Sequence, residues 1–219
     1  MKNNAVIFDM DGVLIDSYQA HFKSWLAMAE PEGFTFTEQE FARTFGRTSR
    51  EIIALLWGNG RLSEEEIAAL DDKKEEAFRW VITLAFPAMP GVNRLLGDLH
   101  DAGFALAVGS SGPPENVDLV IDRLDARPLF GAVVNALDVT RGKPDPQVFQ
   151  IAAERLDADP KRCVVIEDAP AGIEAAHAAG MAAVGLTSTG RTRQSLADAD
   201  LVVGSLAELS PERIGTLGA

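Results

Sequence analysis

Six short apolar runs, rich in β-branched residues, constrain the fold of this chain more than any other feature. Each run ends in small or acidic residues, and helical patterns follow. The runs do not alternate with polar residues, which indicates strands that are buried on both faces. They are Ala5–Phe8, Ala105–Val108, Ala132–Val134, Cys163–Ile166, Ala182–Gly185 and Leu201–Val203. Strands that alternate with helices predict an α/β fold built on a doubly wound parallel sheet.

Helices are predicted between these strands. The sequence pattern favours helices over Val92–His100, Ser111–Leu124 and Ala171–Ala179. A further helix is expected after Asp145, which is a favourable N-cap residue. Gly180 follows the last of these segments and is typical of a helix C-terminus.

Residues 17–85 interrupt this alternation of strands and helices, because the pattern after the first strand becomes helical and stays helical. The expected helices are Tyr18–Glu30, Thr37–Phe45, Ser49–Trp57 and Ser63–Ala85. The last three begin at a hydroxyl residue followed by glutamate, which favours a helix N-terminus. We therefore expect two domains, an α/β core of residues 1–16 and 86–219 and a smaller helical insert of residues 17–85.

Charge and cysteine content exclude several classes of protein. The chain has 20 Lys and Arg against 33 Asp and Glu, a net charge of −13, which argues against nucleic acid and anionic membranes as partners. Its single cysteine, Cys163, allows no disulfide and no zinc cluster. The first apolar run is too short for a signal peptide, and no apolar stretch is long enough to span a bilayer. We expect a cytoplasmic monomer or weak homo-oligomer that acts on a small metabolite.

Two pairs of acidic residues follow two of the predicted strands. Asp9 and Asp11 follow the first strand and share one face of the extended chain, and Glu167 and Asp168 follow the fourth. Ligands bind beyond the carboxyl ends of parallel strands, and Mg²⁺ prefers carboxylate oxygens. The pattern predicts a magnesium site. Taken alone, Asp-x-Asp-Gly is also a turn motif, and acids after a strand can cap the next helix.

A lysine and two serines complete the candidate site. Lys143 stands just before a proline-bounded helix start, and Ser110 and Ser111 follow the second strand, where backbone N–H groups favour an anion. Alone, these residues are equally consistent with a surface lysine and a helix cap. Together, four carboxylates, one lysine, one Mg²⁺ and one proton sum to zero charge, so such a site can accept a phosphate.

These residues occur in the order of a known family. The segment Phe8-Asp9-Met10-Asp11-Gly12-Val13 is followed by Ser110, Lys143 and Glu167-Asp168. On this basis the sequence resembles, over its full length, the haloacid dehalogenase superfamily of phosphoryl-transfer enzymes. The helical insert resembles the cap domain of the β-phosphoglucomutase-like subfamily.

The resemblance implies a role for each site residue. Asp9 would be the nucleophile that forms an aspartyl-phosphate, and Asp11 would be the general acid–base. Ser110 and Lys143 would hold the transferring phosphoryl oxygens. The implied ligands of Mg²⁺ are Asp9, the backbone carbonyl of Asp11, Glu167 and Asp168. Dehalogenation, the family's namesake reaction, needs neither a metal nor a second acid, so these residues argue against it.

Substrate choice is expected to lie in the helical insert, which can close over a site and exclude water. The segment from Phe45 to Arg50 offers Gly46, Arg47, Ser49 and Arg50, a set suited to phosphate or sugar oxygens. By similarity to β-phosphoglucomutase, His21, Arg50 and Lys74 match sugar-phosphate-binding positions. Lys74 also fits a solvated helix face. Ser111, after the second strand, is a further candidate for substrate binding.

Hydrolysis and phosphoryl transfer between sugar hydroxyls are both consistent with this site. After Ser110 the chain reads Ser111-Gly112-Pro113-Pro114, whereas the mutases carry polar and basic residues that bind a second phosphate. We therefore favour a Mg²⁺-dependent phosphatase for a small phosphorylated sugar or similar metabolite. The alternative is a β-phosphoglucomutase, which converts β-glucose 1-phosphate to glucose 6-phosphate. A non-catalytic, receiver-like phosphoprotein would be about half this length and would lack the helical insert.

Overall fold

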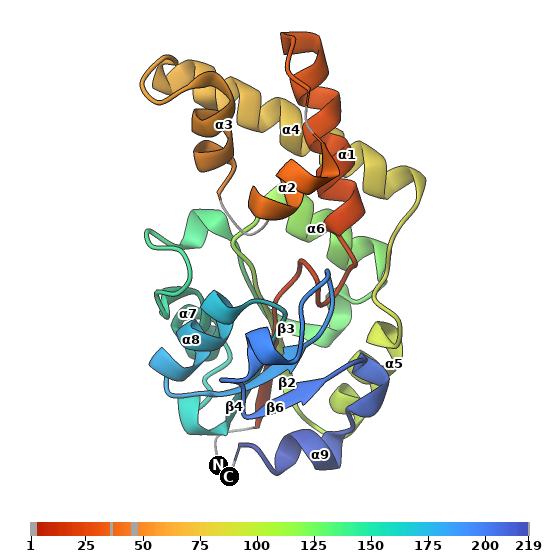
Figure 1. The fold of residues 1–219 in the computed structure, drawn as a ribbon. Helices are drawn as coiled ribbons and strands as arrows, with labels where there is room; N and C mark the ends of the chain where they lie inside the picture. The colour runs from red at the N-terminus through yellow and green to blue at the C-terminus, as the bar shows by residue number, and fades with distance from the viewer. Residues whose placement is uncertain (1–3, 36, 45–47, 219) are drawn as a thin grey trace. The chain divides into compact units, whose positions relative to one another are not determined.

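A computed structural model describes residues 4–35, 37–44 and 48–218. The chain divides into two compact units (Figure 1). Met1–Asp16 and Pro87–Ala219 form an α/β unit, and Ser17–Phe86 form a helical unit inserted into it. Within the described residues, the structure contains no helix with both the length and the apolar character needed to cross a bilayer.

The α/β unit is built on a six-stranded sheet in which every neighbouring pair is parallel. The strand order is β3-β2-β1-β4-β5-β6. The strands are β1 (Ala5–Phe8), β2 (Ala105–Gly109), β3 (Phe130–Val134), β4 (Cys163–Glu167), β5 (Ala182–Leu186) and β6 (Leu201–Val203). The central position of β1, with β2 on one side and β4 on the other, places the carboxyl ends of these three strands side by side.

Helices cover the sheet and bury its apolar side chains. They are α5 (Val92–Asp101), α6 (Pro114–Arg123), α7 (Gln147–Arg155), α8 (Pro170–Ala178) and α9 (Pro211–Gly215). Helices α7 and α8 share one apolar cluster with the sheet, in which Phe149 and Ile173 pack with Ile7 and Val165. All four residues of β1 are fully buried, which explains why this strand is apolar on both faces. Burying an Ile or Phe side chain contributes about 1.5–3 kcal/mol.

The helical unit has its own core. It consists of α1 (Tyr18–Ala29), α2 (Glu38–Thr44), α3 (Ser49–Trp57) and α4 (Glu64–Leu84), with a 3-10 turn at Glu30–Glu32. Trp25 and Met28 of α1 pack with Phe41 of α2 and with Ile52 and Ile53 of α3. This apolar cluster is what allows a short element such as α2 to persist, because short helices are marginal without tertiary packing.

Helix α3 has the predicted bounds, Ser49–Trp57, with Thr48 as the N-cap whose hydroxyl accepts from the backbone N–H of Glu51 in a capping box. The starts of α6 and α7 differ from the sequence-based expectation. Helix α6 begins at Pro114 and not at Ser111, because Pro113 is extended. Asp145 is not the N-cap of α7. Its carboxylate nevertheless accepts a hydrogen bond from the backbone N–H of Gln147. Asp145 therefore satisfies a backbone donor at the start of the helix, as an N-cap side chain would.

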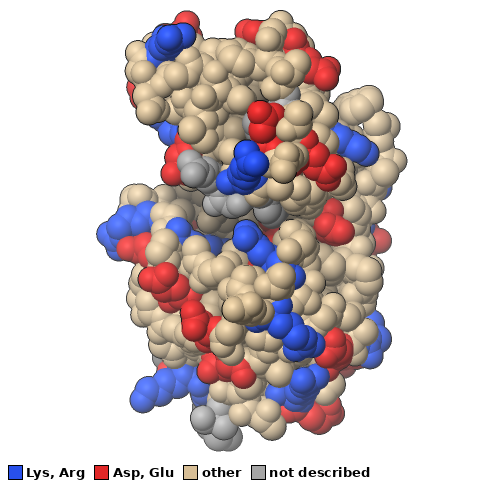
Figure 2. Space-filling view, in the orientation of Figure 1, with Lys and Arg blue, Asp and Glu red and all other residues tan. Residues whose placement is uncertain are grey.

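Charged side chains are mixed over the face seen in Figure 2, where Lys and Arg lie between Asp and Glu. The net charge of −13 therefore does not make this face uniformly acidic. For a small ligand, local clusters of charge matter more than the net charge, because exposed charges more than about 10 Å apart are largely screened at physiological salt.

Candidate active site

Acidic and hydroxyl side chains of the α/β unit gather at the carboxyl edge of its sheet. Asp9 follows β1, Ser110 follows β2, Glu167 is the last residue of β4, and Asp168 follows it. The backbone N–H of Asp9 donates to the carbonyl oxygen of Ile166 at 3.0 Å, which extends the pairing of β1 and β4 to the acidic residues. The parallel register therefore brings together carboxylates that are far apart in sequence.

Lys143 joins the two acidic strand ends. Its Nζ donates to Asp9 Oδ1 and to Glu167 Oε1, each at 2.7 Å, and to the carbonyl oxygen of Gly109 at 3.2 Å. The ammonium group also lies 4.9 Å from the centre of the Phe149 ring. With 12% of its side chain exposed, Lys143 is a largely buried cation held by two carboxylates, and not the surface lysine that its sequence context also allowed.

Two glycines make room for the acidic side chains. A Cβ at Gly172 would lie 1.9 Å from Glu167 Oε1, and a Cβ at Gly12 would lie 2.3 Å from Asp168 Oδ2. Gly12 also has φ +75°, which side chains rarely adopt. Both positions therefore require glycine for the carboxylates to lie where they do.

Backbone and side-chain donors fix the orientation of the β4 carboxylates. Glu167 Oε2 accepts from the N–H groups of Asp168 and Ala169, both at 2.9 Å. Asp168 Oδ2 accepts from the Thr189 hydroxyl at 2.5 Å. Glu167 Oε1, which accepts from Lys143, and the second oxygen of Asp168 each keep acceptor capacity for a further partner.

A divalent cation fits this set of residues. Asp9, Glu167 and Asp168 each offer a carboxylate oxygen, and these atoms lie within 4.8 Å of one another. All three residues are buried, and their combined charge exceeds what Lys143 alone can balance. Oxygen ligands and few carboxylates are what Mg²⁺ requires, so the donor set agrees with the metal predicted from the sequence.

The protonation of the cluster reflects burial and charge. Burial raises the pKa of Asp9 well above its ordinary value, and although Lys143 lowers it, Glu167 adds a further increase. Burial and the Glu167 carboxylate raise the pKa of Asp168 to about 7, against the lowering effects of Thr189 and Arg191. Burial alone would lower the pKa of Lys143, but Asp9 and Glu167 raise it. Lys143 is therefore a permanent cation, while Asp9 and Asp168 retain protons more strongly than free carboxyl groups.

Ser110, Ser111 and Asp11 differ in their surroundings. Ser110 is buried, and its hydroxyl accepts from the backbone N–H of Gly112 at 3.0 Å. Ser111 is exposed, and Asp11 is half-buried in the turn after β1. Ser110 is thus held at the carboxyl end of β2, next to β1, whereas Ser111 faces solvent.

Two of the residues predicted to bind substrate, His21 and Lys74, meet inside the helical unit. Lys74 Nζ lies 3.1 Å from His21 Nδ1 and 2.6 Å from Glu75 Oε1. The ring of His21 stacks on Phe78 with 4.2 Å between centroids. Lys74 is only 3% exposed. The alternative interpretation, in which Lys74 lies on a solvated helix face, is therefore wrong.

Other residues predicted in the helical unit have different direct partners. Arg50 forms an exposed ion pair with Glu64 at 2.5 Å, and the Ser49 side chain hydrogen-bonds to Asp71 and lowers its pKa against the larger effect of burial. Gly46 and Arg47 lie outside the described residues. Asp71 also lies near enough to Lys74 and Arg50 for its charge to interact with theirs, so Asp71 is a shared acidic neighbour of Ser49, Arg50 and Lys74.

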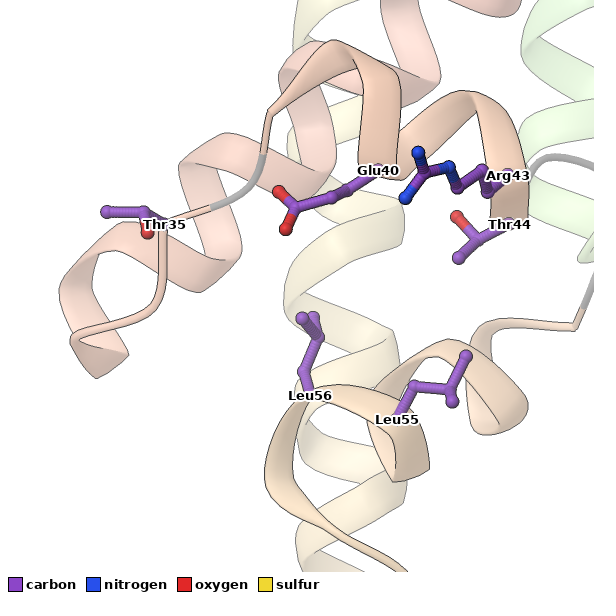
Figure 3. Close-up of a pocket in the computed structure, with 6 residues that line it drawn as sticks. All are labelled: Thr35, Glu40, Arg43, Thr44, Leu55 and Leu56. Atoms are coloured by element: carbon purple, nitrogen blue, oxygen red, sulfur yellow. The ribbon is translucent and has the colours of Figure 1, made fainter.

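A separate hollow of about 240 Å³ lies between α2 and α3 of the helical unit (Figure 3). Leu55 and Leu56 of α3 face Arg43 and Thr44 of α2 across it. Its lining is Thr35, Glu40, Arg43, Thr44, Leu55 and Leu56. None of these residues was predicted from the sequence to bind substrate.

The loop after β5 contributes contacts that the sequence interpretation missed. Ser188 and Thr189 hydrogen-bond to Gly12 and Asp168, and Arg191 lies near enough to Asp168 to lower its pKa. The available signal in the sequence was the position of this loop at the carboxyl end of β5, the strand beside β4. It was overlooked because hydroxyl residues in such a loop form no recognisable motif.

A parallel α/β sheet whose strand ends hold a buried lysine and clustered carboxylates, with a helical unit inserted after β1, is the arrangement of a phosphoryl-transfer enzyme, in which charge stabilisation dominates catalysis. Comparison with known proteins agrees. Residues 4–180 match the haloacid dehalogenase-like hydrolase family, and the chain belongs to this family. The resemblance to this family and the fold predicted from the sequence are thereby confirmed.

Relatives cover almost the whole chain. It is 34% identical to a β-phosphoglucomutase of Bacillus subtilis, over 95% of this chain and 92% of that protein. It is 31% identical to a phosphorylated carbohydrates phosphatase of Thermotoga maritima, over 96% and 95% of the two chains. The crystal structure of β-phosphoglucomutase from Clostridium difficile superimposes with a TM-score of 0.86 at 27% identity, covering 99% of this chain and 97% of that one. These similarities support the β-phosphoglucomutase-like subfamily.

Proposed function

We propose that the protein is a Mg²⁺-dependent phosphatase that hydrolyses a small phosphorylated sugar or similar metabolite through an aspartyl-phosphate. The observation that carries the proposal is Lys143, bonded at 2.7 Å to both Asp9 and Glu167, beside Asp168. This arrangement places a potential nucleophile, a permanent cation and a metal-binding cluster at one sheet edge. The Thermotoga maritima relative is named for phosphorylated carbohydrates, which supports the substrate class.

In the first half of the reaction, a carboxylate oxygen of Asp9 attacks the phosphorus atom. A new O–P bond forms as the bond to the substrate oxygen breaks, and Asp11 donates a proton to that leaving oxygen. In the second half, Asp11 takes a proton from water, which attacks phosphorus and breaks the Asp9 O–P bond. Inorganic phosphate leaves, and both aspartates return to their starting states.

The remaining site residues stabilise the charges of the nucleophile and of the phosphoryl group. Lys143 favours the ionised form of Asp9, against the effect of burial, and with Ser110 it holds the oxygens of the transferring group. Asp9, the backbone carbonyl of Asp11, Glu167 and Asp168 would hold Mg²⁺. When bound, the cation neutralises negative charge on the phosphoryl oxygens.

We assign substrate selection to the helical insert, residues 17–85, and catalysis to residues 1–16 and 86–219. His21, Ser49, Arg50 and Lys74 offer donors for sugar and phosphate oxygens, and Gly46, Arg47 and Ser111 complete the proposed set. The meeting of His21 and Lys74 supports this role for two of them. A single cysteine and the net charge of −13 favour action in the cytoplasm, as a monomer or weak homo-oligomer, without nucleic acid or membrane partners.

A second candidate is a β-phosphoglucomutase, which the relative from Bacillus subtilis favours. In that case a sugar hydroxyl, and not water, would accept the phosphoryl group from Asp9. The segment after Ser110 argues for hydrolysis, because Pro113 and Pro114 lack backbone donors and charge for a second phosphate.

A ³¹P NMR time course distinguishes the two activities. The protein is incubated with Mg²⁺, β-glucose 1-phosphate and a trace of the 1,6-bisphosphate, and then with a panel of other sugar phosphates. Growth of an inorganic phosphate signal supports the phosphatase. Formation of glucose 6-phosphate without free phosphate would instead establish the mutase.

The variant Asp9→Asn tests the nucleophile. Since the amide cannot form the acyl-phosphate, we expect Mg²⁺-dependent hydrolysis of p-nitrophenyl phosphate to fall by about 10⁴-fold or more, with the far-UV circular dichroism unchanged. Asp101→Asn, at an exposed position, is the matched control and should retain full activity. Substantial residual activity in Asp9→Asn would exclude Asp9 as the nucleophile.

A further inference from the structure

The loop that follows β5 reaches the acidic cluster from a third strand. In the sheet, β5 lies beside β4, which lies beside β1, so the loops after these strands share one edge. Asp9 directly follows β1, and Asp168 directly follows β4. The residues Ser188 to Arg191 lie in the loop after β5 and include none of the acids that the proposed reaction uses.

Two hydroxyl groups of this loop contact the acidic elements directly. The Thr189 hydroxyl donates to Asp168 Oδ2 at 2.5 Å, and the Ser188 hydroxyl donates to the carbonyl oxygen of Gly12 at 2.5 Å. Gly12 belongs to the turn that carries Asp9 and Asp11. Thr189 therefore holds the Asp168 carboxylate after β4, and Ser188 holds the turn after β1.

The loop is itself anchored on the side away from the acids. The N–H of Thr187 donates to the carbonyl oxygen of Val203 in β6 at 2.9 Å. Within the loop, the N–H of Arg191 donates to the carbonyl oxygen of Ser188 at 2.8 Å. These bonds make the loop a fixed support for the two hydroxyl groups.

Thr189 has a backbone conformation that its side chain disfavours. Its φ is +52°, and that of the next residue, Gly190, is +78°. A β-branched residue at positive φ is a genuine outlier, and such outliers gather at functional sites. Glycine or asparagine would adopt this conformation at lower cost, but glycine would supply no hydroxyl to Asp168.

We propose that Thr189 is a positioning residue that holds Asp168 for metal binding, with Ser188 steadying the adjacent turn at Gly12. By occupying Oδ2, the hydroxyl fixes the carboxylate plane and leaves the other oxygen for the cation. Groups that hydrogen-bond to metal ligands typically change metal affinity by 10- to 100-fold when removed. This inference rests on the proposed function, because it assumes that the acidic cluster binds a divalent cation.

The test measures Mn²⁺ binding to the whole protein by electron paramagnetic resonance, without substrate. Thr189→Gly removes the hydroxyl and also relieves the unfavourable φ, so it should fold at least as well as the parent chain. We expect its Mn²⁺ dissociation constant to rise by about 10- to 100-fold. Thr189→Ser keeps a hydroxyl and should bind Mn²⁺ within a few-fold of the parent. Thr216→Val, which removes a hydroxyl that donates to the carbonyl oxygen of Arg213 at 2.8 Å, is the matched control.

Unchanged Mn²⁺ affinity in Thr189→Gly would overturn the positioning role, and so would an equal loss in Thr189→Gly and Thr189→Ser. Absence of Mn²⁺ binding to the parent protein would overturn it as well. The proposed function is judged separately, by release of phosphate from sugar phosphates. A parent protein that binds Mn²⁺ but hydrolyses none of them would refute the phosphatase and leave the positioning role standing.

Discussion

Lys143 is the residue on which the electrostatics of the acidic cluster depend. It is largely buried, and its two short bonds go to Asp9 and Glu167. Removing one partner of a buried ion pair is costly, because the other charges stay behind without compensation. Here two carboxylates would be left facing each other, with Asp168 beside them.

We therefore predict that Lys143→Met destabilises the metal-free protein by about 3–5 kcal/mol at pH 8. The loss should shrink at pH 5, where the carboxyl groups can take up protons, and also in saturating Mg²⁺. Urea unfolding followed by circular dichroism measures both effects. Lys161→Met, at an exposed position, is the matched control. A Lys143→Met protein as stable as this control at pH 8 would contradict the argument.

At the scale of elements, strands were more predictable than the starts of helices. The six apolar runs match β1 to β6 within two residues at each end, because uninterrupted burial on both faces leaves a strong pattern. The start of α6 was predicted three residues too early, at Ser111, because serine is a favourable cap, whereas the extended Pro113 makes Pro114 the first helical residue.

The candidate site was predictable where strand ends determine it. Asp9, Glu167 and Asp168 lie together because adjacent parallel strands end at one edge. The contacts of Thr189 were not predictable, since they depend on the path of a loop and on one unfavourable φ. The pairing of His21 with Lys74 depends on how α1 packs against α4, which the sequence resemblance alone does not describe.

Gly172 in helix α8 gives a prediction in which the sign of the stability change depends on the neighbouring Glu167. Replacing a helical glycine with alanine normally stabilises a protein by about 0.5–1 kcal/mol. At Gly172, however, the new Cβ would lie 1.9 Å from Glu167 Oε1. We expect Gly172→Ala to destabilise the protein by about 1–3 kcal/mol, the usual cost of overpacking, and to weaken Mn²⁺ binding.

The matched control for this variant lies in α5. A Cβ at Gly97 would meet nothing within 4 Å, so Gly97→Ala should show the ordinary stabilisation. Thermal unfolding of the two variants gives the comparison directly. If both substitutions change stability in the same direction, the close approach of Glu167 to α8 is not what requires a glycine at position 172.

For the whole molecule, the charges at the sheet edge link stability to pH and to metal. In the metal-free protein, burial raises the pKa of Asp9 and, together with Glu167, raises that of Asp168 to about 7. An acid whose pKa is higher in the folded state binds protons more strongly there than in the unfolded chain. The contribution of these groups to stability therefore decreases as the pH rises from about 4 through about 7.

A divalent cation should reverse this effect, because it binds the ionised carboxylates that high pH creates. We predict that Mg²⁺ raises the melting temperature much more at pH 8 than at pH 5. With Mg²⁺ at about 1,000 times its Kd, the gain at pH 8 is about 4 kcal/mol, or roughly 10 °C for a chain of this size. Differential scanning calorimetry with Mg²⁺ or EDTA measures the gain, and Asp168→Asn should show little of it. Equal increases at the two pH values would mean that protons and Mg²⁺ do not compete for these carboxylates.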